Sequence, residues 1–379
     1  MKKILIVPDS FKGSLSAAEV ADIIAEEAHL AFPQAEVLKV PVADGGEGLV
    51  DVVLSLMGGK RHTIKVHDPL MREISADYAE LPNGAVVIEM AAAAGLPLLS
   101  VGERDVMRAT TFGVGELILD AAKKGFNPIM VGLGGSATND AGVGAARALG
   151  LQFWDADNQP VLYAHDLVTI ERITASASFS QSSQLHLIFL SDVRNPLCGP
   201  QGASYIFGPQ KGATPEQVEA LDRGLMHLAG VIEKQTKRDL CSEPGIGAAG
   251  GFALPFMGYF QSELRSGIEF VLDLGNFNQK LAGTDLVISG EGRTDAQSAM
   301  GKAISAIARR CKDAGVPLVL LSGSVTPDAE PLRALGVTEM ITITPEGMPL
   351  EQAMQAAGDN LRYAAQRFFV GILAGKLKR

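Results

Sequence analysis

The chain has 379 residues, of which 47% are hydrophobic and 20% are charged, and its formal net charge at pH 7 is −10. This composition excludes a disordered or fibrous protein, and the length predicts two soluble domains of ordinary size. The acidic balance and the lack of a long lysine or arginine run argue against nucleic acid as a partner, although a small anion can still bind locally.

Cysteine content and hydropathy bear on the cellular location. Cys198, Cys241 and Cys311 are too few and too scattered for a disulfide framework or a zinc site, which favours a reducing cytoplasm. The apolar run at 3–7 is too short for a signal peptide, and the stretch 85–101 is interrupted by a glutamate, a glycine and a proline. We therefore expect a cytoplasmic protein without a membrane partner; the sequence makes no prediction of the oligomeric state.

The N-terminal segment alternates strands and helices. A buried strand pattern covers 3–7, and Ser16 with Glu19 forms a capping box that opens a helix to about residue 32. A second strand at 37–42 precedes a glycine cluster and a helix that ends near residue 56. This order is typical of a parallel sheet with helices on its faces.

The middle of the chain introduces antiparallel strands. Two strand patterns, 78–81 and 85–90, flank Asn83-Gly84, a strong signal for a tight hairpin. Further along, the sequence predicts a helix at 116–124, strands at 129–133 and 185–190, and a helix from 215 to about 237.

The strand and helix alternation of the N-terminus resumes at residue 285. The predicted elements are strands at 286–288, 316–321 and 341–343, a helix at about 302–314 and a helix from about 350. The two ends share one pattern, so we expect one discontinuous α/β domain from 1–60 and 285–379. A mixed α/β domain, 61–284, would be inserted in it.

Glycines and acidic residues gather where apolar strands end. The densest cluster is Gly132–Asp140, and similar clusters lie at Val40–Gly48 and Leu286–Asp295. Bare backbone N–H groups can cradle a phosphate, and Asp and Glu provide the oxygen ligands that Mg²⁺ prefers. Turn and capping chemistry alone is the alternative for each cluster, with Asn139 or Asp140 capping the next helix.

The common nucleotide motifs are missing from the sequence. Gly301-Lys302 is followed by Ala303 and has no glycine at position 296, so it is not a P-loop. The glycines at 132 and 134 also lack the third glycine of a dinucleotide fingerprint.

Two further residues stand out. Asp192 follows the strand at 185–190, where it could act as a base, bind a metal or simply form a turn before Pro196. Lys211 lies in a loop flanked by Gly208 and Gly212. Its ammonium group could contact a phosphate or a carboxylate, or it could simply be solvated.

Taken together, these residues resemble the two-domain bacterial glycerate kinases, the family that includes enzymes of glyoxylate and glucarate catabolism. The resemblance runs in order along nearly the whole chain. It covers Pro8–Lys12, Val40–Gly48, Gly134–Asp140, Asp192–Leu197, Phe207–Gly212, Gly247–Gly251, Ser266–Glu269, and Gly290–Arg293 with Asp295, Gln297, Ser298, Gly301 and Lys302. Departures are small: Gly13 stands where an acid is common, and Ala141 where glycine is.

The resemblance implies a discontinuous flavodoxin-like, parallel-sheet domain and an inserted mixed α/β domain. It also implies ATP-dependent phosphorylation of D-glycerate, with the 2-hydroxyl as the favoured acceptor and the 3-hydroxyl as the alternative. A non-catalytic two-domain protein that binds a small carboxylate is the competing hypothesis. The acids among the glycines argue against it, because a carboxylate binder should avoid them.

The same resemblance places residues in the site, with ATP and Mg²⁺ as cofactors. The ATP phosphates would lie on Gly134, Gly135, Ser136, Ala137, Thr138 and Asn139. Substrate-binding positions would be Lys12, Gly45, Gly46, Lys211 and Lys302. Catalytic roles would fall to Asp192, Asp44, Arg293 and Asp295, and metal binding to Asp44, Glu47 and Asp192.

Overall fold

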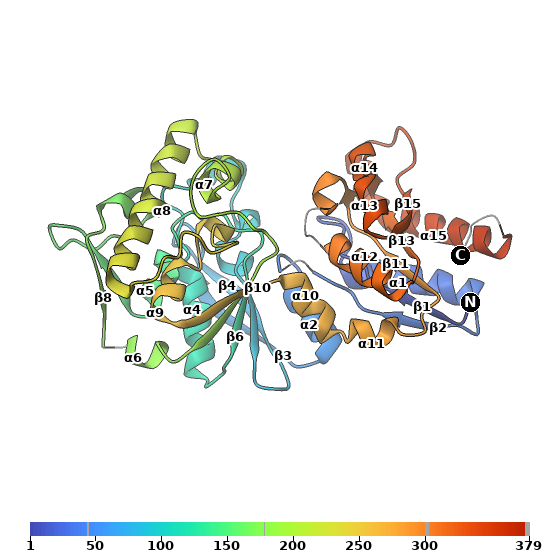
Figure 1. Cartoon of the computed structure of the whole chain (residues 1–379), viewed down its shortest axis with the longest axis horizontal. Helices are drawn as coiled ribbons and strands as arrows, with labels where there is room; N and C mark the ends of the chain where they lie inside the picture. Colours follow the sequence, from blue (N-terminus) through green and yellow to red (C-terminus); the bar gives the residue numbers. More distant parts are fainter. Residues whose placement is uncertain (44, 178, 300–302, 376–379) are drawn as a thin grey trace. The chain divides into compact units, whose positions relative to one another are not determined.

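The computed structural model describes residues 1–43, 45–177, 179–299 and 303–375 (Figure 1). The chain divides into two compact units. The first unit comprises Met1–Asp44, Asp51–Met57 and Ile268–Arg379, and the second comprises Gly45–Val50 and Gly58–Gly267. The domain boundaries expected from the sequence, after residue 60 and after residue 284, stay a prediction.

The first unit is built on a five-stranded parallel sheet with the spatial order β15-β13-β11-β1-β2. Its strands are β1 (Lys3–Ile6), β2 (Glu36–Lys39), β11 (Leu286–Ser289), β13 (Leu318–Ser322) and β15 (Val337–Thr342). Numbered along the unit, this is the order 2-1-3-4-5 of flavodoxin-like folds. The chain reverses direction across the sheet between β1 and β11, where such folds bind their ligands.

Two helices cover one face of this sheet, α1 (Ala17–Ala31) and α15 (Ala357–Leu373). Ile4 and Ile6 alternate along β1 and both belong to the apolar cluster that these helices complete. The predicted capping box starts α1: the Glu19 N–H donates to Ser16 Oγ at 3.2 Å, and the Ser16 N–H donates to Glu19 Oε2 at 2.8 Å.

The second unit contains a six-stranded mixed sheet with the order β10-β9-β6-β5-β4-β3. Its strands are β3 (Lys60–His67), β4 (Glu73–Glu80), β5 (Val86–Glu89), β6 (Ile129–Gly132), β9 (His186–Leu190) and β10 (Gln261–Arg265). Strands β5, β6, β9 and β10 are parallel, and β4 and β3 run antiparallel to their neighbours. The predicted turn joins β4 to β5, with Gly84 at φ +81°.

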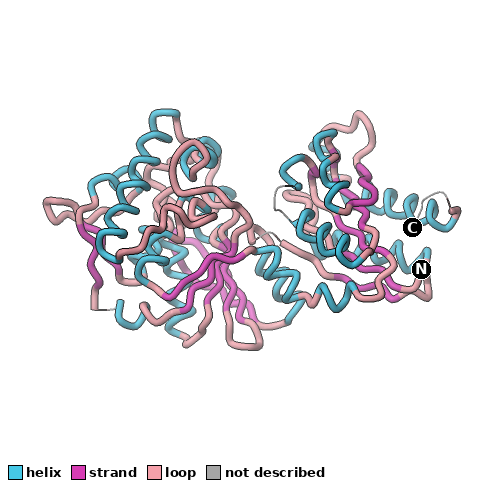
Figure 2. Tube along the Cα trace, in the orientation of Figure 1, coloured by secondary structure: helices cyan, strands magenta, loops and turns pink. Residues whose placement is uncertain are grey.

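The remaining elements are shorter or flank these sheets, and Figure 2 shows helices in cyan and strands in magenta. The other helices are α2 (Leu49–Met57), α3 (Ala91–Ala94), α4 (Phe112–Lys123), α5 (Val143–Ala148), α6 (Phe179–Ser182), α7 (Ala203–Phe207), α8 (Pro215–Thr236), α9 (Leu254–Tyr259), α10 (Gly267–Leu274), α11 (Phe277–Leu281), α12 (Ala303–Ala314), α13 (Pro331–Leu335) and α14 (Leu350–Gln355). The other strands pair as β7 (Leu151–Trp154) with β8 (Arg172–Ala175) and β12 (Arg293–Thr294) with β14 (Ser324–Val325).

The fold class expected from the sequence is confirmed: a parallel flavodoxin-like sheet is made from both ends of the chain, and a mixed α/β unit interrupts it. Strand β3 was not predicted. Most of its side chains are exposed or half-buried, so it lacks the apolar run that marks a central strand. Across the described segments, none of the helices combines the length and apolarity needed to cross a membrane.

Candidate functional site

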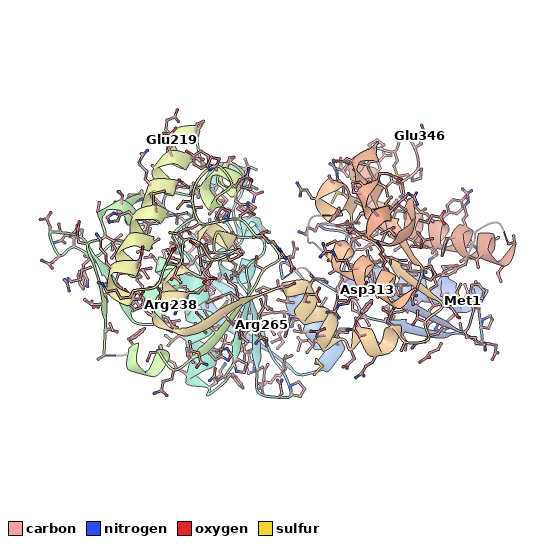
Figure 3. The ribbon with its side chains drawn as sticks, in the orientation of Figure 1. Met1, Glu219, Arg238, Arg265, Asp313 and Glu346 are labelled. Carbon is pink, nitrogen blue, oxygen red and sulfur yellow. The ribbon has the colours of Figure 1, made fainter. Side chains whose placement is uncertain are left out.

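Four parallel strands of the second unit end at one edge of its sheet, and polar residues follow three of them. Arg265, the last residue of β10, is labelled in Figure 3 and accepts a backbone hydrogen bond from Ser191, which directly follows β9. The residues that follow these two, Asp192 and Ser266, are also in contact. Ser266 Oγ donates to Asp192 Oδ1 at 2.5 Å. The structure thus places half-buried Asp192 at the carboxyl edge.

The segment Gly45-Gly46 lies across the same edge and touches the glycine loop that follows β6. The Gly134 N–H donates to the Gly45 carbonyl at 3.1 Å. A Cβ on Gly134 would lie 2.4 Å from Gly46 Cα, and a Cβ on Gly132 would lie 2.4 Å from the Gly45 oxygen. Only glycine permits such an approach of two backbones, so packing explains part of the glycine content.

Lys211 lies beneath this loop, which spans 133–140. It ends a 3₁₀ turn, Pro209–Lys211, that stops at Gly212 with φ +94°. The side chain is 2% exposed, and Nζ donates to Ser136 Oγ at 2.8 Å and to the Thr138 carbonyl at 2.6 Å. Burial lowers the pKa of Lys211 to about 7, against a smaller raising effect from Asp140. Lys211 therefore holds the loop from inside the protein, and the alternative that this side chain is simply solvated is excluded.

Asp140 ties the other end of the loop to α4. Its buried carboxylate accepts hydrogen bonds from the Thr111 N–H and Oγ1, both at 2.8 Å, and from the N–H groups of Gly142 and Gly144, both at 3.1 Å. Burial raises the pKa of this carboxyl, while these hydrogen bonds act in the opposite direction. The N-cap residue of the next helix, α5, is Gly142, and Asp140, two residues before it, binds N–H groups at the start of that helix.

Two polar atoms of the loop are buried without a hydrogen-bond partner among the described residues: Thr138 Oγ1 and Asn139 Oδ1. The amide nitrogen of Asn139 donates to Ser204 Oγ at 3.1 Å. Unpaired buried polar groups are costly and rare in native structures, so these two atoms call for a partner such as a ligand or an ordered water. A hydroxyl, glycine N–H groups and a buried lysine form a donor set that suits the oxygens of a phosphate.

The first unit contains a cavity of about 580 Å³ at the point where its strand order reverses. Asp9 and Lys12 line it from the loop after β1, and Glu291, Arg293 and Asp295 line it from the segment after β11. The Arg293 side chain is 67% exposed, and its Nε lies 3.4 Å from Asp295 Oδ2. Acidic and basic groups therefore share this cavity.

Glu291 is held within the first unit by hydroxyl groups. Its Oε1 accepts hydrogen bonds from Ser298 Oγ at 2.5 Å and from Thr294 Oγ1 at 3.1 Å. Glu291 and Asp9 are not among the site residues predicted from the sequence. Both closely follow the ends of buried strands, which is the signal that could have identified them.

The predicted site residues divide between the two units. Lys12, Arg293 and Asp295 line the cavity of the first unit. The second unit holds Gly45, Gly46, exposed Glu47, Gly134–Asn139, Asp192 and Lys211. The predictions for Asp44 and Lys302 lie outside the described residues.

The described side chains provide no group of three or more His, Cys, Asp or Glu residues arranged to hold a metal. Mg²⁺ is usually held by one or two carboxylates together with substrate phosphates and waters, so such a group is not required for it. The metal-binding roles of Asp192 and Glu47 stay predictions.

Comparison with known proteins decides the family. The model of the glycerate kinase family matches residues 4–372. The chain belongs to the glycerate kinase family. This match confirms the predicted family and, with it, the prediction that the chain is an enzyme of the kinase class.

Named relatives of this family align over almost their full length. The chain is 38% identical to glycerate 2-kinase of Escherichia coli K12 and 36% identical to glycerate kinase of Halalkalibacterium halodurans, and each alignment covers 98% of both chains. A crystal structure from Salmonella typhimurium LT2, provisionally named glycerate kinase 2, has 37% sequence identity and a TM-score of 0.85. It covers 99% of both chains. The fold is therefore shared along the whole chain.

Proposed function

We propose that this protein transfers the γ-phosphoryl group of ATP to the 2-hydroxyl of D-glycerate, with Mg²⁺ as the metal. Relatives named glycerate kinase or glycerate 2-kinase that align over both chains support this substrate and this position. Transfer to the 3-hydroxyl is the alternative.

The observation that carries the proposal is the glycine loop at the carboxyl edge of the second unit's sheet. Phosphoryl transfer depends mainly on alignment and on neutralising the charge of the phosphates. Lys211 supplies a buried amine to Ser136 and Thr138 directly beneath the loop. The N–H groups of Gly134 and Ala137 already donate to the Gly45 and Ala94 carbonyls, so the phosphates would contact other backbone N–H groups of Gly134–Asn139. We place the ATP phosphates there.

Asp192 is the proposed base. Its carboxylate would take the proton from the glycerate hydroxyl as the hydroxyl oxygen bonds to the γ-phosphorus and the bond to ADP breaks. The short hydrogen bond from Ser266 fixes one carboxylate oxygen and orients the group. Asp44 and Asp295 remain proposed participants in catalysis.

The remaining roles concern charge. Lys12 and Arg293, with Lys302, are proposed to bind the glycerate carboxylate or the transferring phosphoryl group. Mg²⁺, held by phosphate oxygens together with Asp192, Glu47 or Asp44, would neutralise negative charge on the phosphates.

We also propose a cytoplasmic location. The three thiols are unpaired in the structure, and Cys311 is buried. A reducing compartment suits such residues.

The proposed function is tested by following ADP release with purified protein, ATP and Mg²⁺. ADP should form when D-glycerate is added and should not form with L-glycerate or without an acceptor. Equal ADP release with and without D-glycerate would refute the proposal and would leave the carboxylate-binding hypothesis in its place.

A further inference from the structure

Arg104 is a half-buried arginine of the second unit, and it packs against the turn that carries Lys211. Its Nη1 donates to the carbonyl of Gln210, the residue before Lys211, at 3.1 Å. A Cβ on Gly212 would lie 2.7 Å from the Arg104 carbonyl oxygen. Both the side chain and the backbone of Arg104 therefore contact this turn. Arg104 is not among the site residues predicted from the sequence.

The segment that leads to Arg104 also borders the glycine loop at 133–140. The Leu96 N–H donates to the Gly135 carbonyl at 2.9 Å. On the other side, Lys211 Nζ donates to Ser136 Oγ at 2.8 Å. Arg104 thus joins two segments that each contact the loop.

The charge of Arg104 is not neutralised by a carboxylate in the part of the chain that the structure describes. The two acids beside it in the sequence are engaged elsewhere. Glu103 Oε1 lies 2.6 Å from Arg72 Nη1. Asp105 Oδ1 accepts a hydrogen bond from the Met107 N–H at 3.2 Å. The positive charge is therefore left for another partner.

The Nε atom of Arg104 is buried and has no hydrogen-bond partner among the described residues. A buried donor on a charged group is more costly to leave unpaired than one on a neutral group. Nε and Nη2 share one edge of a guanidinium, and this edge binds two oxygens of a carboxylate or a phosphate side by side. The partner that suits Arg104 is therefore an oxyanion.

Lys211 does not supply the same charge to the loop. Its Nζ already donates to Ser136 Oγ and to the Thr138 carbonyl. Burial lowers the pKa of Lys211 to about 7, so much of its charge is lost at pH 8. An arginine keeps its charge throughout this range.

We propose that Arg104 binds an oxyanion of a substrate beside the glycine loop, with Nε and Nη2 donating to two of its oxygens. This inference rests on the proposed function, because it takes ATP and D-glycerate to be the substrates. A phosphate of ATP and the carboxylate of D-glycerate both present such a pair of oxygens, so the experiment has one arm for each. Lys211 is the only cation of the second unit among the site residues predicted from the sequence, and Arg104 adds another.

The test replaces Arg104 with glutamine and with lysine. Calorimetry measures the dissociation constant of AMP-PNP with Mg²⁺ in one arm and of D-glycerate in the other. Arg104→Gln should raise it about tenfold or more in the arm whose ligand carries the bound oxyanion. Arg104→Lys should recover only part of this loss, because an ammonium group lacks the paired donors of a guanidinium.

The matched control is Arg108→Gln. Arg108 is an exposed arginine of the same segment, and its guanidinium carbon lies 5.9 Å from the centre of the Tyr163 ring. This variant removes the same charge from the same unit, and it should bind both ligands as the wild type does.

A second measurement separates ligand binding from support of the turn. The buried amine of Lys211 should make the unfolding free energy rise between about pH 7 and pH 9, because the unfolded chain binds more protons there. Arg104→Gln should keep this rise while it loses affinity. Loss of the rise together with the affinity would overturn the inference, because Arg104 would then act only through the position of Lys211.

Two binding results would also overturn the inference. Wild-type affinity for both ligands in Arg104→Gln would leave an ordered water as the partner of Nε, and wild-type affinity in Arg104→Lys would exclude the paired contact. The failure of the proposed function looks different, because the wild type then forms no phosphoglycerate while calorimetry with each ligand still reports on Arg104. A wild type that binds neither ligand would overturn both proposals.

Discussion

Replacing Lys211 with methionine tests how the buried amine supports the glycine loop at 133–140. Methionine fills a similar volume and removes Nζ, so Ser136 Oγ and the Thr138 carbonyl both lose a donor. Each buried group left unpaired costs about 1–3 kcal/mol. The variant should therefore loosen the loop without emptying the space beneath it.

The pH dependence of stability separates the amine from plain packing. Burial lowers the pKa of Lys211 from 10.5 to about 7. Below about pH 7 the folded and unfolded chains both hold the proton, so Lys211 adds no pH dependence there. Above it the unfolded chain binds more protons, so stability rises with pH up to about 10.5. Relative to Lys211→Met, the wild type should gain about 2 kcal/mol of unfolding free energy between about pH 7 and pH 9.

Nucleotide binding gives the functional readout. A phosphate close to the amine would raise the pKa of Lys211, so ATP binding near pH 8 should take up protons. Calorimetry in two buffers of different ionisation enthalpy measures this uptake. We expect uptake for the wild type and for Lys123→Met, an exposed control in the same unit, and less uptake with weaker binding for Lys211→Met.

The same proton uptake in the wild type and in Lys211→Met would refute this reasoning, because it would place the phosphates away from Lys211. A flat difference in stability between about pH 7 and pH 9 would refute the lowered pKa itself.

Three further predictions concern the base, the loop and the metal. Asp192→Asn should cut turnover by about 10²-fold, the scale of a lost general base. The control Asp157→Asn, in an exposed turn, should leave turnover unchanged. Near-normal turnover of Asp192→Asn would return Asp192 to a turn-forming role. Gly134→Ala would bring a Cβ to 2.4 Å from Gly46 Cα and should lower both Tm and nucleotide affinity, unlike Gly102→Ala, where nothing lies within 4 Å of the added atom. An unchanged Tm and affinity would contradict that packing. EDTA should abolish turnover and Mg²⁺ should restore it, so turnover that persists in EDTA would remove the metal from the mechanism.

Much of the fold could be predicted because its strands are short buried runs with clear ends. The run that became β1, the capping box of α1 and the Asn83-Gly84 turn are local signals, and the structure has each of them. The edge strand β3 was missed, because an exposed strand has no such run.

The site was predictable only in part, because its contacts join distant segments. Strand ends indicated where Asp192 and the glycine loop would lie. The sequence could not reveal that Gly45 and Gly134 touch through their backbones, or that Lys211 reaches Ser136 from 75 positions away. Nor did it indicate that Met354 and Leu350 line the first unit's cavity, since they belong to a helix far along the chain from Lys12.

The most direct test of the central claim is phosphorus NMR of the product formed from D-glycerate, ATP and Mg²⁺. We expect the phosphoglycerate resonance to match 2-phospho-D-glycerate and to couple to the single proton at carbon 2. A resonance coupled to the two protons at carbon 3 would establish the 3-phosphate instead, and no phosphoglycerate signal at all would contradict the proposed function.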